Sequence, residues 1–308
     1  MSGMLLFPGQ GVQEVGMGRD LAEGLPECAA LFARAGELLG FDVLKLCREG
    51  PIEELTKSHH AQPAIFTVSM AAWTALGHFA GAGFAPAGAA GHSLGEWAAL
   101  CAAGVVSFED AVRILHARGR FMQEACEAAP GGMLAVIGLP PEELEAVAAQ
   151  SGLEMANLNS PQQTVLSGAA DRLEAGAEAA KAAGAKRAIR LPVAGAFHST
   201  LMQPAADRLA ALLADVEFRA PATPVWSNVS GRRHGGPDEI RAAMVAQVVS
   251  GVRWTDCYRD MAAAGMTLGM ECGPGRVLAD LGRRILPEVK VVNIFDLAGA
   301  REAATLGP

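Results

Sequence analysis

The chain has 308 residues, of which 51% are hydrophobic and 19% charged, and its formal net charge is -8 at pH 7. This composition is that of an ordinary globular protein with a sizeable buried core, in one large domain or two smaller ones. The basic residues are scattered along an acidic chain, which excludes a nucleic-acid footprint and disfavours an anionic membrane surface, so we expect neither partner.

The cysteines indicate a reducing compartment. There are six, without a CxxC pair and mostly in helix-like apolar contexts: Cys28, Cys47, Cys101, Cys126, Cys257 and Cys272. We interpret them as reduced core thiols of a cytoplasmic protein, in preference to disulfides or metal ligands. The MLLF run is too short for a signal peptide, and no apolar run approaches the ~20 residues of a membrane span.

Strand-like and helical stretches alternate along the first part of the chain, which predicts an α/β fold. MLLF (4–7) predicts a strand that Pro8 ends, and AGAAG (87–91) a strand of small residues. Helices are expected at 22–40, at 62–83 and from Leu94 to Gly104, each with a glycine at its end.

The middle of the chain has a pattern of its own. GGMLAVIGL (131–139), TVLSG (164–168) and KRAIRLPV (186–193) predict strands, and helices are expected between them at 140–151 and 171–184. Two β-α-β halves in about 65 residues resemble the ferredoxin-like motif. We therefore predict a small subdomain at 128–193, inserted into a larger α/β domain formed by 1–127 and 194–308.

Ser93 stands in G-x-S-x-G (91–95), between an expected strand and an expected helix. Such a turn is typical of a nucleophile elbow, because it lifts the serine oxygen out and leaves room for substrate beside the glycines. The amide of Leu94, at a helix N-terminus, would face a developing oxyanion. Taken alone, the motif is also compatible with a plain glycine-rich turn.

A second glycine-rich loop, FPGQGVQ (7–13), follows the first expected strand. Gly9 and Gly11 match the start of a dinucleotide-binding fingerprint, but Glu14 stands where its third glycine is needed, and no P-loop lysine follows. Nucleotide binding is therefore disfavoured. The loop can supply a second oxyanion amide, which we assign to Gln10, and a plain turn is the alternative.

Arg118 lies in the middle of the apolar stripe of a helix expected over 107–125, whereas Arg113 and Arg120 lie on the other face. A guanidinium keeps its charge, so on a buried face it needs an anionic partner, and its forked donor set fits a carboxylate. Periodicity alone leaves two interpretations open: an internal salt bridge to an Asp or Glu, or a carboxylate of the substrate.

His198 follows an extended apolar run and precedes a helical start, at an element end where bases are commonly displayed. It also lies C-terminal to the serine, as the base of α/β-hydrolase sites does. The other histidines lie in the serine turn (His92) or in polar or helix-surface settings (His59, His60, His78, His116 and His234). No obvious acid completes a triad, so a structural histidine is the alternative, but the exposed serine favours a base.

Seven segments occur together in a recognisable order: FPGQG, QPA, GHSLGE, RGRFMQEA, N-x-N-S-P-x-Q, LPV followed by FHS-x-LM, and ECGPG. From Phe7 to Arg284 the chain resembles malonyl-CoA:acyl carrier protein transacylases, which include fatty-acid synthesis enzymes and acyltransferase domains of polyketide synthases. The resemblance implies a hydrolase-like large domain with a parallel-sheet core, a ferredoxin-like insert and an active site between them. It implies a coenzyme A thioester, malonyl-CoA, as substrate, an acyl carrier protein as partner, and no bound cofactor or metal.

The resemblance also implies roles for individual residues. Ser93 is then the acylated nucleophile, His198 its general base, and Arg118 the group that binds the malonyl carboxylate. The backbone amides of Gln10 and Leu94 form the oxyanion hole, and the backbone carbonyl of Gln247 orients the histidine in place of the missing acid. Further residues are assigned to the substrate pocket or the coenzyme A channel: Gln62, Met122, Asn157, Asn159 and Gln163.

Subfamily signals agree with a malonyl substrate. Phe197 before the histidine and Leu94 after the serine resemble malonyl-selective members, whereas methylmalonyl-selective ones tend to have a smaller residue before the histidine. One departure is Gly251, where the family often has proline, and a glycine there is expected to loosen the loop that carries Gln247.

Two other classes of function stay open on the sequence. A serine hydrolase or thioesterase would share Ser93 and His198 but leaves the inward-facing arginine unexplained. A non-catalytic scaffold is disfavoured because all the chemical positions are intact. Because carrier proteins of this type are acidic, docking needs a local basic patch, which we assign to Lys186, Arg187, Arg283 and Arg284.

Overall fold

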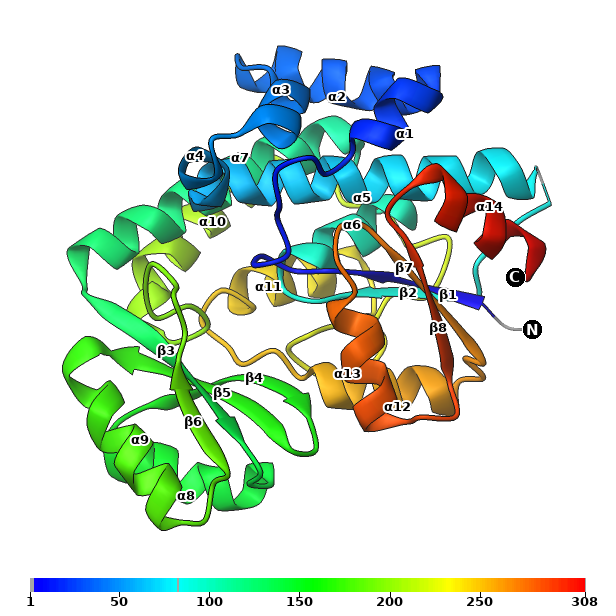
Figure 1. Ribbon diagram of the computed structural model, residues 1–308. Helices are drawn as coiled ribbons and strands as arrows, with labels where there is room; N and C mark the ends of the chain where they lie inside the picture. The colour runs from blue at the N-terminus through cyan, green and yellow to red at the C-terminus, as the bar shows by residue number, and fades with distance from the viewer. Residues whose placement is uncertain (1–2, 82, 308) are drawn as a thin grey trace.

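A computed structural model describes residues 3–81 and 83–307 (Figure 1). Residues 1, 2, 82 and 308 lie outside the described residues. All four belong to the predicted large domain, and residue 82 belongs to the helix expected at 62–83. Over the described ranges the helices are α1 (Arg19–Gly24), α2 (Pro26–Leu39), α3 (Val43–Glu49), α4 (Ile52–Thr56), α5 (Ser58–Ala80), α6 (Leu94–Ala102), α7 (Phe108–Ala128), α8 (Pro141–Ser151), α9 (Leu173–Ala182), α10 (Gln203–Leu213), α11 (Pro237–Ala246), α12 (Trp254–Ala263), α13 (Val277–Ile285) and α14 (Leu297–Thr305), with 3₁₀ turns η1 (Ala170–Arg172) and η2 (Thr200–Met202).

Within the described residues, a four-stranded parallel sheet in the order β2-β1-β7-β8 forms the centre of the larger part of the fold. Its strands are β1 (Gly3–Phe7), β2 (Gly88–Gly91), β7 (Leu268–Cys272) and β8 (Lys290–Ile294). The inner strands are buried along their whole length, because helices cover both faces of the sheet (Figure 1). The predicted parallel-sheet core is confirmed.

Alternate residues of β1 are buried on opposite sides of the sheet. Leu5 and Phe7 belong to the hydrophobic cluster that includes residues of α5, α6 and α7, whereas Met4 and Leu6 belong to the one that includes residues of α12 and α13. Because all four strands run parallel, their carboxyl ends meet at one edge, where the segments after β1 and β2 carry Gln10 and Ser93.

Helices α5 and α7 pack closely and bring Gln62 of α5 and Arg118 of α7 together. Gly119 of α7 makes the approach possible, since a Cβ there would lie 2.3 Å from the backbone oxygen of Ser58. The prediction that α5 starts at Gln62 was wrong, because α5 begins at Ser58 and contains Pro63. Proline cannot donate to the carbonyl four residues earlier, and that carbonyl, of His59, instead contacts the ring of His116 at 2.9 Å.

The helix expected at 22–40 is two helices, because the chain is extended at Leu25 and Pro26 begins a new one as its first residue. The other predicted elements of the large part are present close to their expected bounds. Ser107 caps α7 by accepting a hydrogen bond from the amide of Asp110.

The second sheet of the described chain is antiparallel, in the order β4-β5-β3-β6, with α8 and α9 packed on it (Figure 1). Its strands are β3 (Gly131–Ile137), β4 (Glu154–Ser160), β5 (Gln163–Ala169) and β6 (Arg187–Arg190). The element order β3-α8-β4-β5-α9-β6 confirms the ferredoxin-like insert. β4 was not predicted from the sequence, because its polar sequence EMANLNS does not alternate. The domain boundaries at 128 and 193 stay a prediction.

The segment after α11 joins the two sheets. Val252 donates its backbone amide to the carbonyl of Ala156 at 2.8 Å and accepts from the amide of Leu158 at 2.9 Å, both in β4. A Cβ at Gly251 would lie 2.4 Å from the oxygen of Met155. The glycine that departs from the family pattern thus lets this loop lie directly against β4, where two hydrogen bonds hold it.

The six cysteines are free thiols, and five of them are buried. Burial raises the pKa of Cys47 and of Cys101 to about 12, so these thiols stay protonated at neutral pH and are poor nucleophiles. Among the helices of the described residues, none combines the length and the hydropathy that crossing a membrane would require.

Candidate active site

Ser93 sits in a sharp turn between β2 and α6. Its backbone has φ 52 and ψ -109, a conformation that L-residues rarely adopt and that is typical of functional sites. The flanking glycines are needed for packing: a Cβ at Gly91 would lie 1.9 Å from the carbonyl carbon of Gly95, and a Cβ at Gly95 would lie 2.1 Å from the oxygen of Phe7. The elbow is therefore pressed against the end of β1.

His198 lies beside the serine, and its backbone also has a positive φ, of 58°. The Nε2 atom of His198 is 2.8 Å from Ser93 Oγ, and Nδ1 is 2.8 Å from the backbone oxygen of Gln247. Because a carbonyl can only accept, Nδ1 carries the proton and Nε2 is free to take one from the serine. Burial, and then the nearby charge of Arg118, lower the pKa of His198 to about 3, so the imidazole is neutral at physiological pH.

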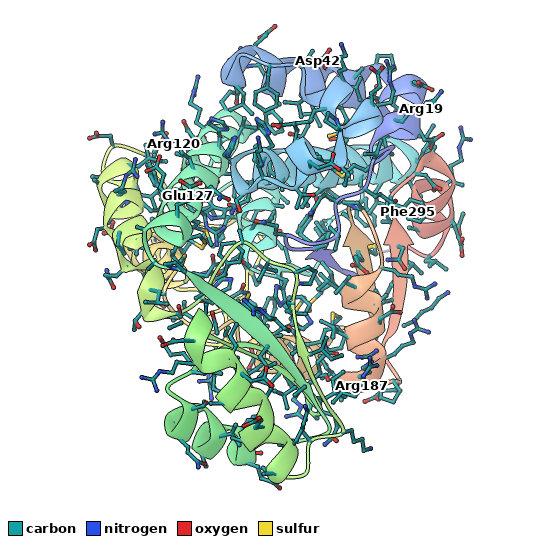
Figure 2. The ribbon with its side chains drawn as sticks, turned by 60° about the vertical axis from the view of Figure 1, so that its left-hand side comes forward. Arg19, Asp42, Arg120, Glu127, Arg187 and Phe295 are labelled. Atoms are coloured by element: carbon teal, nitrogen blue, oxygen red, sulfur yellow. The ribbon has the colours of Figure 1, made fainter. Side chains whose placement is uncertain are left out.

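Arg118 is 1% exposed and reaches into the site from α7. It donates to Gln62 Oε1 at 2.7 Å, to Gln247 Oε1 at 3.1 Å and to Ser93 Oγ at 3.2 Å. Burial lowers its pKa to about 10, which still leaves the guanidinium charged at neutral pH. Arg113 and Arg120 are exposed as expected, and Figure 2 shows Arg120 on the outer surface of the molecule.

No acidic side chain of the described residues forms an ion pair with Arg118, so an internal salt bridge does not account for its burial. Its Nε atom is also buried and has no hydrogen-bond partner among the residues described. A buried cation held by neutral groups, with a donor unused, is a ready binding site for an anion.

Two residues are predicted to supply the oxyanion amides: Leu94, which follows Ser93 in the chain, and Gln10, which lines the same pocket as Ser93. Leu94 is the first residue of α6, so its N–H has no partner within the helix. Gln10 lies in the loop after β1, and its side chain donates to Ser58 Oγ at 3.1 Å and accepts from Gln62 Nε2 at 3.3 Å. These contacts tie the loop after β1 to α5.

A pocket leads from these groups to the surface between the two sheets. Its lining includes most of the predicted site: Gln10, Gln62, Ser93, Arg118, Met122, Asn157, Phe197 and His198. The loop 191–194 forms part of its wall, and Val193 there is 37% exposed. The end of the pocket at Ser93 and Arg118 is therefore buried, and its other end is open.

Two residues predicted for the coenzyme A channel, Asn159 and Gln163, make contacts with other side chains. Asn159 contacts the ring of His92 through its Oδ1 at 2.9 Å. Gln163, at the start of β5, accepts a hydrogen bond from Arg284 at 2.5 Å. Neither is among the residues that line the pocket, and their place in the coenzyme A channel stays a prediction.

The two predicted basic pairs lie close to one another although almost a hundred residues separate them. Gln163, which Arg284 contacts, pairs with Ile137 in the small sheet, and Ile137 pairs on its other side with Arg187. Lys186 and Arg187 are exposed at this end of the sheet, where Figure 2 labels Arg187, and Arg283 and Arg284 are exposed on α13. Arg283 also contacts Asp280.

A buried polar group close to the elbow was not predicted from the sequence. Glu96, on α6, is 1% exposed, and its carboxylate contacts His234 Nε2, Gln247 Nε2 and the amide of Asn228. Asn228 in turn accepts from the amide of Ser93 at 2.7 Å. His234 stands in a polar stretch of sequence, but its side chain is only 1% exposed. A charged residue in the apolar helix LGEWAALCA was the available signal.

Comparison with known proteins identifies the family to which the chain is similar. The acyl transferase domain family matches residues 4–304. The malonyl CoA-acyl carrier protein transacylase of Escherichia coli strain K12 is 45% identical over 288 residues, which cover 91% of this chain and 92% of that protein. The solved acyl carrier protein S-malonyltransferase of Vibrio cholerae has a TM-score of 0.95 at 40% identity, covering 98% of this chain and 100% of that one. A malonyl-transacylase solved in complex with a type II PKS acyl-carrier protein has a TM-score of 0.95 at 38% identity, with both chains covered in full.

Proposed function

The chain belongs to the acyl transferase domain family, and from this premise we propose that it moves a malonyl group from malonyl-CoA, through an ester on Ser93, to the phosphopantetheine thiol of an acyl carrier protein. One observation carries the choice of acyl group. The buried guanidinium of Arg118, without an acidic partner, lies 3.2 Å from the oxygen that would be acylated. A carboxylate on the acyl chain would supply the missing anion.

In the first half-reaction His198 takes the proton of Ser93 Oγ through Nε2, and the oxygen attacks the thioester carbonyl of malonyl-CoA. The backbone carbonyl of Gln247 then holds the imidazolium that forms. The amides of Gln10 and Leu94 donate to the tetrahedral oxyanion, which collapses to the seryl ester as the coenzyme A thiolate leaves with the proton from His198.

Arg118 decides which acyl group is held. The malonyl carboxylate replaces Ser93 Oγ as a partner of the guanidinium and leaves the serine to His198 alone. Gln62, bonded to the other guanidinium nitrogen, fixes the plane of the fork. Met122 and Phe197 line the same pocket and limit the size of the acyl chain.

In the second half-reaction the phosphopantetheine thiol of the carrier enters by the same opening and the steps run in reverse. Asn157 borders this path, and the basic patch (Lys186, Arg187, Arg283 and Arg284) receives the acidic carrier. Nucleophile, base and oxyanion donors all belong to the chain, so the proposed chemistry uses no bound cofactor. We place the protein in the cytoplasm. We place its catalytic cleft between a large domain (1–127 and 194–308) and a small domain (128–193).

Intact-protein mass spectrometry tests this function. The chain should gain one malonyl group after incubation with malonyl-CoA and lose it when a phosphopantetheinylated carrier protein is added. Ser93→Ala should not gain the group. A serine hydrolase or thioesterase would instead release free malonate without carrier, and a chain that does so rapidly would contradict the proposed transfer.

A further inference from the structure

A second buried charge lies one side chain away from Arg118. Glu96 follows the nucleophile by three residues, in the first turn of α6, and is as buried as Arg118. Each of its carboxylate oxygens has a nitrogen partner. Oε1 lies 2.6 Å from His234 Nε2, and Oε2 lies 2.6 Å from Gln247 Nε2 and 3.1 Å from the amide of Asn228.

The side-chain amide of Gln247 connects the two charges. Its Nε2 donates to Glu96 and its Oε1 accepts from Arg118 at 3.1 Å. The orientation of this amide follows from chemistry, since a carboxylate can only accept and a guanidinium can only donate. Cation, amide dipole and anion are thus aligned head to tail in a buried environment, where such interactions are stronger than in water.

Arg118 has no acidic partner in contact, yet it is not electrostatically alone. The charge of Glu96 raises the pKa of Arg118 and so opposes the effect of its burial. Ser93 belongs to the same arrangement, because its carbonyl accepts from Gln247 Nε2 at 3.0 Å and its amide donates to Asn228.

We propose that Glu96 is a positioning residue that acts as the buried counter-charge of Arg118 through the amide of Gln247, and that its charge sets how tightly the pocket holds an anionic acyl group. The second part rests on the proposed function, whereas the first part does not. In the empty pocket Glu96 stabilises the guanidinium. When an acyl carboxylate arrives, Glu96 repels it and keeps the complex weak enough for the group to be passed on.

Neutralising Glu96 should strengthen the binding of an anionic acyl group. Glu96→Gln keeps the shape, and its amide can still accept from Gln247 and donate to His234 in the other tautomer. Only the charge is lost, so an anionic acyl group should bind more tightly, by about 3- to 10-fold for two charges separated by one amide. A neutral acyl group should be affected by less than about 2-fold.

The test compares dissociation constants of malonyl-CoA and acetyl-CoA by calorimetry, in Ser93→Ala protein so that no acyl transfer occurs. We expect Glu96→Gln to strengthen malonyl-CoA binding relative to acetyl-CoA. Glu271→Gln is the matched control, because Glu271 is also fully buried but holds the amides of Leu278 and Ala279 at the start of α13. An unchanged ratio in Glu96→Gln, as in the control, would overturn the effect on acyl binding.

A second experiment tests the counter-charge without any substrate. Glu96→Gln and Arg118→Met should each lower Tm. The Tm of the double variant should fall clearly less than the sum of the two single decreases, because both charges are then removed and neither is left unpaired. Additive losses would overturn the pairing. If Glu96→Gln does not fold alone, the double variant should restore folding, and a double variant that stays unfolded overturns the pairing as well. A wild-type chain that binds neither thioester would instead contradict the proposed function.

Discussion

The Nδ1 atom of His198 lies 2.8 Å from the backbone oxygen of Gln247, at the position where a Ser-His-Asp site presents a carboxylate. The carbonyl fixes the tautomer of the imidazole but brings no net charge to it. The neighbouring charge at this site is instead the positive one of Arg118, which adds to burial in lowering the pKa of the histidine to about 3. The imidazole is therefore neutral at physiological pH, as a general base must be to accept a proton.

The rate of serine acylation should consequently be almost independent of pH between about 5 and 8. At limiting malonyl-CoA the rate follows ionisations of the free enzyme, and His198 is already in its basic form throughout this range. Quenched-flow measurement of the acyl-enzyme gives the profile. An acid limb centred near the ordinary histidine pKa of ~6.5 would contradict a buried, neutral base.

The same shift makes stability depend on pH. The folded pKa of His198 lies below its ordinary value of 6.5, so between the two pH values the unfolded chain binds more protons and stability rises with pH. This contribution is complete above ~6.5 and is lost progressively as the pH falls toward 3. Tm should therefore fall between about pH 7 and pH 5, and His198→Gln should fall less over that interval. Equal falls in the two proteins would rule out His198 as a cause.

The elbow glycines give a test of packing. Gly95→Ala should lower the free energy of unfolding by ~1–3 kcal/mol or more, because its Cβ would lie 2.1 Å from the backbone oxygen of Phe7, which cannot move without moving β1. Gly77→Ala in α5 is the control. Nothing lies within 4 Å of its Cβ position, so it should raise stability by ~0.5–1 kcal/mol. Urea unfolding measures both, and equal effects would contradict the close approach.

Sequence patterns predicted those parts of the fold and site in which the signal is local. The strand, turn and helix around Ser93 follow from a few adjacent residues, and Arg118 stood out because one charge interrupts a helical stripe. The start of α5 could not be found in this way, because Pro63 stands inside the helix and the carbonyl of His59 that it leaves free contacts His116 of another helix. β4 was missed because its place in the sheet is set by pairing with β5 and not by its own polarity.

The buried pair of Glu96 and His234 marks the limit of such analysis. The two residues are 138 positions apart, and His234 stands in a polar stretch that resembles surface. Glu96 carried the same kind of signal as Arg118, because each is a charged residue within an apolar helix. The reasoning that identified Arg118 would therefore have identified Glu96 as well. Its partner could be identified only from the three-dimensional arrangement.

The basic patch predicts that the two half-reactions can be separated. Reversing Arg283 and Arg284 to Glu should slow transfer to the carrier by about ten-fold or more, since an acidic carrier meets repulsion in place of attraction. Self-acylation by malonyl-CoA should stay unchanged, because both residues lie outside the pocket lining. The half-reactions are measured separately by mass spectrometry. Reversing Arg113 and Arg241 to Glu is a control of equal charge change, and equal loss of both half-reactions in the Arg283 and Arg284 variant would reject the docking role.

Arg118→Ala tests the choice of acyl group. Removing the guanidinium should cost malonyl transfer ~2–5 kcal/mol of transition-state stabilisation, because the acyl carboxylate is then buried without a partner. Acetyl transfer should lose much less or even rise, since an acetyl group has no carboxylate and the buried cation opposes its binding. Arg118→Lys should fall between, because an ammonium keeps the charge and loses the fork that contacts Gln62 and Gln247 together.

The ratio of malonyl to acetyl transfer separates this role from a structural one. Arg118 also holds Gln62 and Gln247, so its loss will lower Tm whatever the substrate is. If that were its whole purpose, both activities would fall together, because Gln247 orients the base for every acyl group alike. A role in carboxylate binding requires the ratio to fall by a large factor, and an unchanged ratio with a large loss in Tm would refute it. The proposed choice of acyl group thus depends on one buried charge, and this ratio tests that dependence directly.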